Sequence, residues 1–249
     1  MELQELPHQT NIKVCMPTDV YLSPCFVFAR MRSIAERNQL AEILKSRKLQ
    51  QEKESWISAV YLQAIAEFEK IPHWLRACQD NTPDVEGIKI LWSKHGNELL
   101  TYSLEVCEYE SHAQKGILDV LKRKLEKSYP RHFTILCYAH SRCEEHVDVE
   151  NLADGICASS PLIKDVWIIN SKDELGGEYI VTRVFPKPII QLELDINDDS
   201  HFEKQEPILK ISGRGRSSSK EFEKLGIAYI PIPKLIDKKL KVGLTNRID

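Results

Sequence analysis

The chain has 249 residues, a length that suits one large domain or two small ones. Apolar residues make up 42% and charged residues 29%, as in ordinary globular proteins, and 10 Gly and 12 Pro are too few for a low-complexity or collagen-like protein. With 34 basic and 37 acidic residues the net charge is -3, which excludes a strongly basic, histone-like protein but not a local basic groove.

The sequence carries no sign of a membrane or secreted protein. No run of about 20 apolar residues is present, and the acidic residues 1–5 lack the basic segment of a secretory signal. The seven Cys are odd in number and scattered, which is typical of reduced thiols in the cytoplasm rather than of a disulfide framework. We therefore expect a cytoplasmic protein with no membrane partner.

The first part of the chain predicts an extension followed by helices. Residues 1–29 contain three prolines and no helical period, which indicates an extension with one short strand. Residues 30–51 are rich in good helix formers. A second helix is predicted over 54–70, where apolar residues recur at spacings of three and four, and Pro72 ends it.

The middle of the chain predicts strands and helices in alternation. Residues 88–92 and 99–107 form a hairpin around the turn at 94–97. A helix over 112–128 precedes a buried strand over 133–139, which is apolar or β-favouring throughout. A helix over 148–157 and strands over 166–170 and 179–185 follow, and this order predicts an α/β fold.

The last part of the chain is mostly polar. Pro186 and Pro188 close the regular region, and residues 194–220 are predicted to be loops. A short helix over 219–225 and a strand over 227–232 end the prediction.

Two carboxylates at the ends of neighbouring strands are the most informative feature. Asp84 follows Pro83 and opens one strand of the hairpin, and Glu105 lies late in the other. Antiparallel pairing brings such residues side by side. Together with the backbone carbonyl of Val106, they offer the oxygen ligands that Mg²⁺ or Mn²⁺ prefers, and such an ion can polarise a phosphodiester and activate water.

At these residues the sequence resembles the PD-(D/E)xK superfamily of restriction-endonuclease-like nucleases. Pro83-Asp84 is similar to the first half of the family signature, and Glu105-Val106-Cys107 to the second half, with Cys107 where the family has Lys. The resemblance covers about residues 54–139 and extends more loosely to 185. It implies a mixed β-sheet flanked by helices, Mg²⁺ or Mn²⁺ as cofactor and a nucleic-acid substrate, DNA rather than RNA.

On this resemblance we divide the chain into three parts: an N-terminal extension over 1–29, a nuclease-like α/β domain over 30–193, and a C-terminal extension over 194–249 that packs on the core or serves in assembly. The oligomeric state stays open, although a homodimer suits a nuclease that cuts both strands.

The thiol of Cys107 cannot supply the cation that the family's lysine places beside the scissile phosphate. In some members the following helix supplies this lysine instead. Lys124 lies in the middle of the apolar arc of the predicted helix, three and four residues after Leu121 and Val120, and could reach Glu105. A lysine that snorkels at the edge of the core is the alternative interpretation. Gln114 lies on the same arc one turn earlier and could touch the substrate or orient the metal site.

The resemblance also implies an acidic residue from the first helix of the family fold. Glu67, at the border of the apolar face of the helix over 54–70, is the candidate metal ligand, and a solvated glutamate is the alternative.

A cluster of basic residues could bind nucleic-acid phosphates. A solvated helix face, balanced by Asp119 and Glu126, explains it equally well. The cluster consists of Lys115, Lys122, Arg123, Lys124, Lys127 and Arg131.

The sequence Cys137-x2-His140-x2-Cys143-x2-His146 contains the two Cys and two His that would suffice for a tetrahedral zinc site. Because Cys137 lies inside a predicted strand, a buried cysteine without metal is the favoured interpretation.

Two functions from different classes stay open at this point. The first is a metal-dependent nuclease in which Asp84 and Glu105 bind the ion, Lys124 replaces the strand lysine and Gln114 assists. The second is a catalytically inactive nuclease-fold protein that serves as a nucleic-acid-binding or assembly subunit, which Cys107 favours.

Overall fold

A computed structural model describes residues 20–35, 49–78, 82–93, 96–110, 116–127, 129–130, 132–140, 147–159, 161–172, 177–198, 208–212 and 227–231. Within these ranges the strands form one ten-stranded sheet in the order β10-β9-β1-β2-β3-β4-β5-β6-β7-β8. The strands are β1 (Tyr21–Leu22), β2 (His73–Ala77), β3 (Val85–Ser93), β4 (Gly96–Tyr109), β5 (Phe133–Ala139), β6 (Asp165–Ser171), β7 (Glu178–Phe185), β8 (Ile190–Asp195), β9 (Ile208–Ser212) and β10 (Ile227–Pro231).

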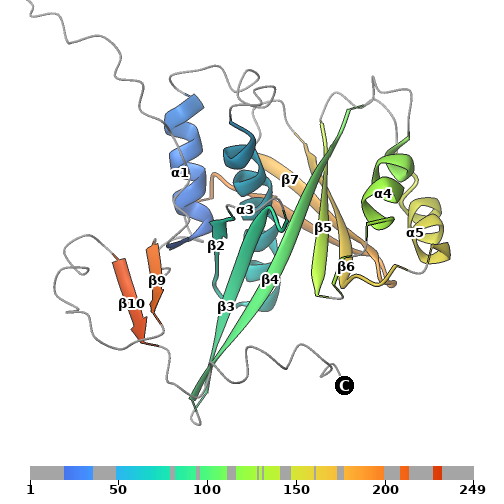
Figure 1. Ribbon diagram of the computed structural model, residues 1–249. Coiled ribbons are helices and arrows are strands. Elements are labelled where there is room, and N and C mark those ends of the chain that lie inside the picture. Colours follow the sequence, from blue (N-terminus) through green and yellow to red (C-terminus); the bar gives the residue numbers. More distant parts are fainter. Residues whose placement is uncertain are drawn as a thin grey trace, which may run out of the picture.

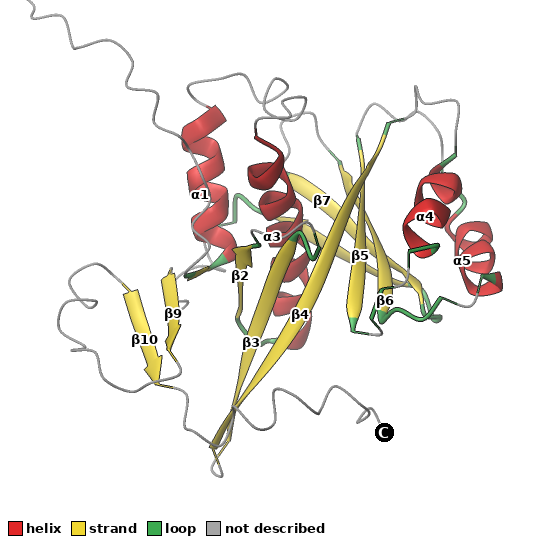
Figure 2. Cartoon of the chain, in the orientation of Figure 1, coloured by secondary structure: helices red, strands yellow, loops and turns green. Residues whose placement is uncertain are grey.

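Four helices cover the sheet in the described part of the chain. They are α1 (Pro24–Ala35), α3 (Gln50–Glu69), α4 (Ile117–Leu125) and α5 (Val149–Ala158). Figures 1 and 2 show α1 and α3 on one face of the sheet and α4 and α5 on the other. Strand pairing is antiparallel except at β4–β5, β5–β6 and β9–β10. The fold is thus mixed α/β, with a large, mostly antiparallel sheet flanked by helices.

Each face of the sheet has its own apolar core, because side chains alternate along a strand. Leu104, Leu136 and Trp167 pack under α1 and α3, whereas Ile135 and Ile168 pack under α4 and α5. All residues of the central strand β5 are buried, since helices cover it on both sides. This double burial explains why the strand predicted over 133–139 is apolar throughout, and that prediction is confirmed.

The other central elements also confirm the sequence predictions. The hairpin predicted over 88–107 is β3 and β4, which pair from Val85–Leu104 to Ser93–Gly96. The helices predicted over 54–70 and 148–157 are α3 and α5, and the strands predicted over 166–170, 179–185 and 227–232 are β6, β7 and β10. Of the helix predicted over 112–128, residues 112–115 and 128 lie outside the described part, and α4 covers Ile117–Leu125. The helix predicted over 219–225 lies outside the described residues.

Three strands were not predicted. Strand β2 lies between β1 and β3 and has no clean alternation of apolar and polar residues. Strand β8 does alternate, with Ile190, Leu192 and Leu194 less exposed than their neighbours. The prediction that Pro186 and Pro188 close the regular region is therefore wrong: these prolines lie in the turn between β7 and β8. Strand β9 lies within residues 194–220, which were predicted to be loops.

The boundaries predicted at 29/30 and 193/194 lie inside α1 and β8. The start of α1 explains the first difference. Ser23 accepts a hydrogen bond on Oγ from the amide of Phe26, as an N-cap residue does, and Pro24 takes the first helical position, where proline is favoured. Of the helix predicted over 30–51, residues 36–48 lie outside the described part, and its ends belong to α1 and α3. The parts of the two predicted extensions that the structure describes thus join the same sheet.

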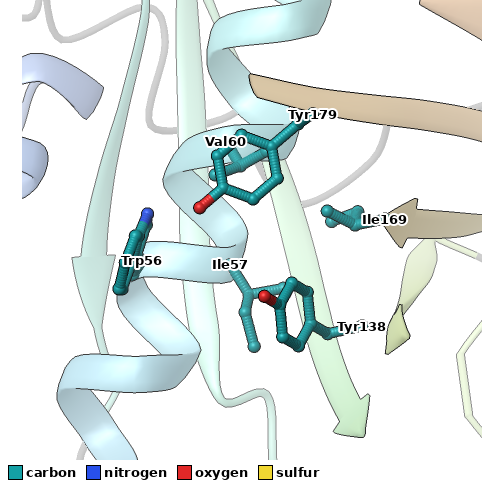
Figure 3. Close-up of a pocket in the computed structure, with 6 residues that line it drawn as sticks. All are labelled: Trp56, Ile57, Val60, Tyr138, Ile169 and Tyr179. Atoms are coloured by element: carbon teal, nitrogen blue, oxygen red, sulfur yellow. The ribbon is translucent and has the colours of Figure 1, made fainter. Parts of the chain in front are cut away.

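The pocket shown in Figure 3 belongs to the core under α3. Apolar and aromatic side chains of α3, β5, β6 and β7 line it: Trp56, Ile57, Val60, Tyr138, Ile169 and Tyr179. None of these side chains is an acid or a cation, so the pocket lacks the groups that phosphodiester chemistry requires. Among the described residues no helix is long and apolar enough to cross a membrane.

The doubly covered centre of the sheet predicts a large mutational effect there. Leu136 is 0% exposed, so Leu136→Ala should lower the free energy of unfolding by about 2–5 kcal/mol through lost burial and a cavity. Leu162 is 66% exposed, and Leu162→Ala should change it by less than about 0.5 kcal/mol. Urea denaturation measures both values, and similar losses in the two variants would contradict this arrangement of the core.

Candidate active site

The candidate site lies at the end of β4 where pairing with β3 stops and pairing with β5 continues. Residues 96–104 of β4 pair with β3, whereas residues 103–109 pair with β5. Beyond Leu104, no described strand continues along the β3 side of β4. Asp84, directly before β3, replaces that strand, because its Oδ2 accepts a hydrogen bond of 2.7 Å from the backbone N–H of Val106. The end of the hairpin thereby ties Asp84 to the residue that follows Glu105.

Glu105 is the buried centre of the site, with 2% exposure. Its Oε1 accepts hydrogen bonds of 2.7 Å from Nζ of Lys124 and 2.8 Å from the hydroxyl of Tyr129. The more exposed ammonium of Lys127 lies 3.8 Å from the same oxygen. A buried carboxylate requires such partners, because its desolvation is otherwise very costly. The second oxygen, Oε2, is buried and has no hydrogen-bond partner among the described residues.

The groups around Glu105 influence one another electrostatically. Burial raises the pKa of Asp84 to about 7, and the charges of Glu54 and Glu105 add to this effect, while the Val106 hydrogen bond and Lys124 oppose it. Burial opposes the charge of Lys124, but the hydrogen bond and charge of Glu105 outweigh it and raise the lysine's pKa. Burial and the bond to Glu105 also raise the pKa of Tyr129. Lys124 therefore stays charged and Tyr129 stays a donor at neutral pH.

The structure brings together four of the six residues singled out from the sequence. Asp84 and Glu105 are linked through Val106, and Lys124 contacts Glu105 from α4. The ammonium of Lys124 therefore points to the carboxylate, as proposed from its place on the apolar arc. Gln114 lies outside the described residues.

Glu67 lies elsewhere in the fold. Its Oε1 accepts a hydrogen bond of 3.0 Å from Gln63 on the same helix. The acidic residue of α3 that does lie near the site is Glu54. Burial raises its pKa, and the charges of Lys124, Glu105 and Glu108 also act on it. Glu54 and Glu67 are 13 residues apart, which separates them by about 20 Å along a helix. The predicted first-helix acid is thus at the wrong end of α3.

Tyr129 and Glu54 were not found by reasoning from the sequence. Tyr129 follows α4 and lies just before β5, in a segment without any helical or strand period. Glu54 is an acidic residue in the first turns of a helix, a position where many solvated glutamates also occur. Only the packing of α3 and α4 against β4 shows that Tyr129 and Glu54 lie near Glu105.

The donor set at this site fits a hard divalent cation. Asp84 and Glu105 are carboxylates on adjoining strand ends, and the buried Oε2 of Glu105 still lacks a partner among the described residues. Such oxygens suit Mg²⁺ or Mn²⁺. No group of three or more His, Cys, Asp or Glu in the described part of the chain is arranged to hold a metal. The residues that could hold a cation here are Asp84 and Glu105, with the backbone carbonyl of Val106.

A second polar cluster lies on the α3 face of the sheet. Glu108 accepts a hydrogen bond of 2.8 Å from Lys53 of α3 and lies 3.1 Å from Nε2 of His140. Although burial opposes its charge, the bonds from His140 and Lys53 lower the pKa of Glu108. Cys137 packs under α4 and α5 on the other face, so it cannot share a zinc ion with His140. The structure thus favours the buried-cysteine interpretation, and Cys143 and His146 lie outside the described residues.

The described basic residues beside the site are largely exposed. Lys122 and Arg123 face solvent on α4, and Lys127 is 55% exposed. Lys124 is the exception, since only 22% of its side chain is exposed. Lys115 and Arg131 lie outside the described residues. Comparisons of the chain with known protein families, curated proteins and solved structures find no match.

The raised pKa of Asp84 makes stability depend on pH. Between pH 3.8 and about 7, Asp84 is still protonated in the folded state but has lost its proton in the unfolded state. The wild type therefore loses stability as the pH rises through this window. Asp84→Asn removes this loss while its amide oxygen still accepts the Val106 hydrogen bond. At about pH 8 the variant should be more stable than the wild type by about 2 kcal/mol. This is roughly half of the free energy that corresponds to the whole pKa shift, because Asp84 is partly exposed.

Urea denaturation at about pH 4 and about pH 8 measures this difference. The advantage of Asp84→Asn should be small at the lower pH and grow toward the higher one. An advantage that does not change with pH would show that Asp84 has an ordinary pKa in the folded protein.

Proposed function

We propose that this protein is a metal-dependent nuclease with a restriction-endonuclease-like fold, and that it hydrolyses phosphodiester bonds of DNA. The observation that carries the proposal is the 2.7 Å contact between Lys124 of α4 and Glu105 of β4. It places a cation beside the two carboxylates, where Cys107 leaves the strand without the lysine of the family signature. The central hairpin followed by two parallel strand pairings supports the fold assignment.

In this proposal Asp84, Glu105 and the carbonyl of Val106 hold Mg²⁺ or Mn²⁺. The bound ion would supply Lewis acidity toward a phosphate oxygen and lower the pKa of a water ligand. Tyr129 holds Glu105 in place through its hydroxyl. Lys124 keeps a positive charge beside the carboxylates, where it can offset the charge that develops on the phosphate in the transition state.

The pKa of Asp84, which burial raises to about 7, has a direct consequence for cation binding. The cation must displace a proton from Asp84 at neutral pH, because only the carboxylate is a good ligand. Cation affinity and cleavage should therefore rise as the pH passes from about 6 to about 8.

The exposed cations of α4 support nucleic acid as the substrate. Lys122, Arg123 and Lys127 lie on the helix that supplies Lys124 or just after it, and nucleic-acid affinity comes largely from such phosphate contacts. DNA is the proposed substrate and RNA is the alternative that the assay below includes.

The second candidate function is a catalytically inactive nuclease scaffold that binds nucleic acid or serves in assembly. Cys107 at the strand position of the signature lysine favours it. The two candidates differ in one measurable respect, since only the nuclease needs to bind a divalent cation.

Cleavage of supercoiled plasmid tests the proposal. The full chain should nick the plasmid with Mg²⁺ or Mn²⁺ but not with a chelator, and Glu105→Gln should reduce the rate by about 10²-fold or more. Glu126→Gln, the same change at an exposed residue after α4, is the matched control and should keep the rate. A single-stranded RNA of similar length is assayed in parallel. Absence of metal-dependent cleavage of either substrate would favour the inactive scaffold.

A lysine exchange tests the role of Lys124 separately. Lys124→Gln should lower the nicking rate by about 10²-fold, because it removes the charge beside Glu105. Adding Cys107→Lys to this variant returns a lysine to the strand position and should recover at least about tenfold of the rate. Lys122→Gln on the solvent side of α4 is the control for lost phosphate binding. Equal losses for Lys124→Gln and Lys122→Gln would show that Lys124 acts only as a phosphate contact.

A further inference from the structure

Two cysteines lie directly opposite each other beside the candidate site. Cys107 of β4 and Cys137 of β5 are paired in the parallel register of these strands. Both belong to the core under α4 and α5, so their side chains project from the same face of the sheet. Neither forms a disulfide bond in the structure, and Cys107 is 9% exposed while Cys137 is 0% exposed.

The spacing of paired strands brings the two backbones within the range of a disulfide. Neighbouring strands lie about 4.8 Å apart, and disulfides join Cα atoms that are about 4.4–6.8 Å apart. The β carbons of a disulfide lie about 3.8 Å apart, about 1 Å closer than the spacing of neighbouring strands. The bridge would therefore draw β4 toward β5 by about 1 Å.

We propose that Cys107 and Cys137 are a modification site at which hydrogen peroxide forms a reversible disulfide. A bridge that strains its strands has a higher reduction potential than a relaxed structural one, and labile bridges of this kind are typical of regulation. The remaining exposure of Cys107 makes it the thiol that peroxide reaches first. Cys137 needs no solvent access, because its reaction partner is the neighbouring sulfur.

The reaction has two balanced steps. The thiolate of Cys107 attacks one oxygen of the peroxide, the O–O bond breaks, and the leaving hydroxide takes up the thiol proton as water, which leaves a sulfenic acid. The thiol of Cys137 then attacks the sulfenic sulfur, the S–O bond breaks, and a second water leaves as the disulfide forms. The two cysteines lose two electrons in total, and one peroxide is reduced to two waters.

The consequence for activity rests on the proposed function. Cys107 is two residues after Glu105 on the same face of β4, and the residue between them donates the hydrogen bond to Asp84. Drawing β4 toward β5 would shift Glu105 relative to Lys124 and disturb the Val106–Asp84 bond. Because a displacement of about 1 Å can cost a catalytic site about 10²-fold, the oxidised protein should lose at least about tenfold of its cleavage rate.

Peptide mass spectrometry of the full chain after peroxide treatment tests the bridge without any assay of activity. The expected product joins the peptides of Cys107 and Cys137 with the loss of two hydrogen masses, and dithiothreitol restores the two thiols. Cys137→Ala should leave Cys107 as a sulfenic acid that dimedone traps, whereas Cys157→Ala on α5 should leave the bridge intact. Two unmodified thiols in the wild type, or Cys107 paired with a different cysteine, would overturn the proposal.

Plasmid nicking by the same samples separates this proposal from the proposed function. Peroxide should inhibit the wild type reversibly and leave Cys137→Ala active. A bridge that forms in a protein without any metal-dependent cleavage would uphold the modification site and overturn only the nuclease. A bridge that forms in an active nuclease without changing its rate would overturn the regulatory consequence.

Discussion

The hydrogen bond between Asp84 and the backbone N–H of Val106 is the interaction on which the candidate site depends. It forms because β3 begins at Val85, whose partner is Leu104, so no residue of β3 lies opposite Val106. The N–H groups of an open strand edge need acceptors, and here the acceptor is a side-chain carboxylate. The same bond holds Asp84 next to Glu105.

The burial of Glu105 explains much of the surrounding chemistry. A carboxylate that is 2% exposed is stable only with charged or hydrogen-bonding partners, and α4 and the segment after it supply Lys124 and Tyr129. Helix α4 therefore fixes the site as well as covering the sheet. Oε2 remains without a described hydrogen-bond partner, and burial, together with the charges of Glu54 and Glu105, raises the pKa of the neighbouring Asp84.

The two faces of the sheet carry different polar groups at the same strand end. Glu105 lies on the α4 face, and Glu108 lies on the α3 face with Lys53 and His140. Burial and the charges of both carboxylates raise the pKa of Glu54, so the first turns of α3 lie near the open edge of β4. This arrangement follows from the start of β3 at Val85, since a β3 that began earlier would pair with that edge.

Local patterns were enough to predict the centre of the fold. The apolar run of 133–139 and the hairpin before it have clear patterns, and Lys124 stood out because a charge in the middle of an apolar arc needs a partner. The missed strand β2 depends on tertiary contacts, because it is defined by its pairing with β1 and β3. The error at Glu67 has the same origin. The period of a helix identifies its buried face, but not which end of that face lies near another element.

The most direct measurement of the central claim is Mn²⁺ binding to the full chain at about pH 8, followed by electron paramagnetic resonance of the free ion. One site per chain is predicted, which is lost in Asp84→Asn and in Glu105→Gln and kept in Glu126→Gln. Binding that persists in both variants would place any cation elsewhere. Absence of binding to the wild type would contradict the metal site itself.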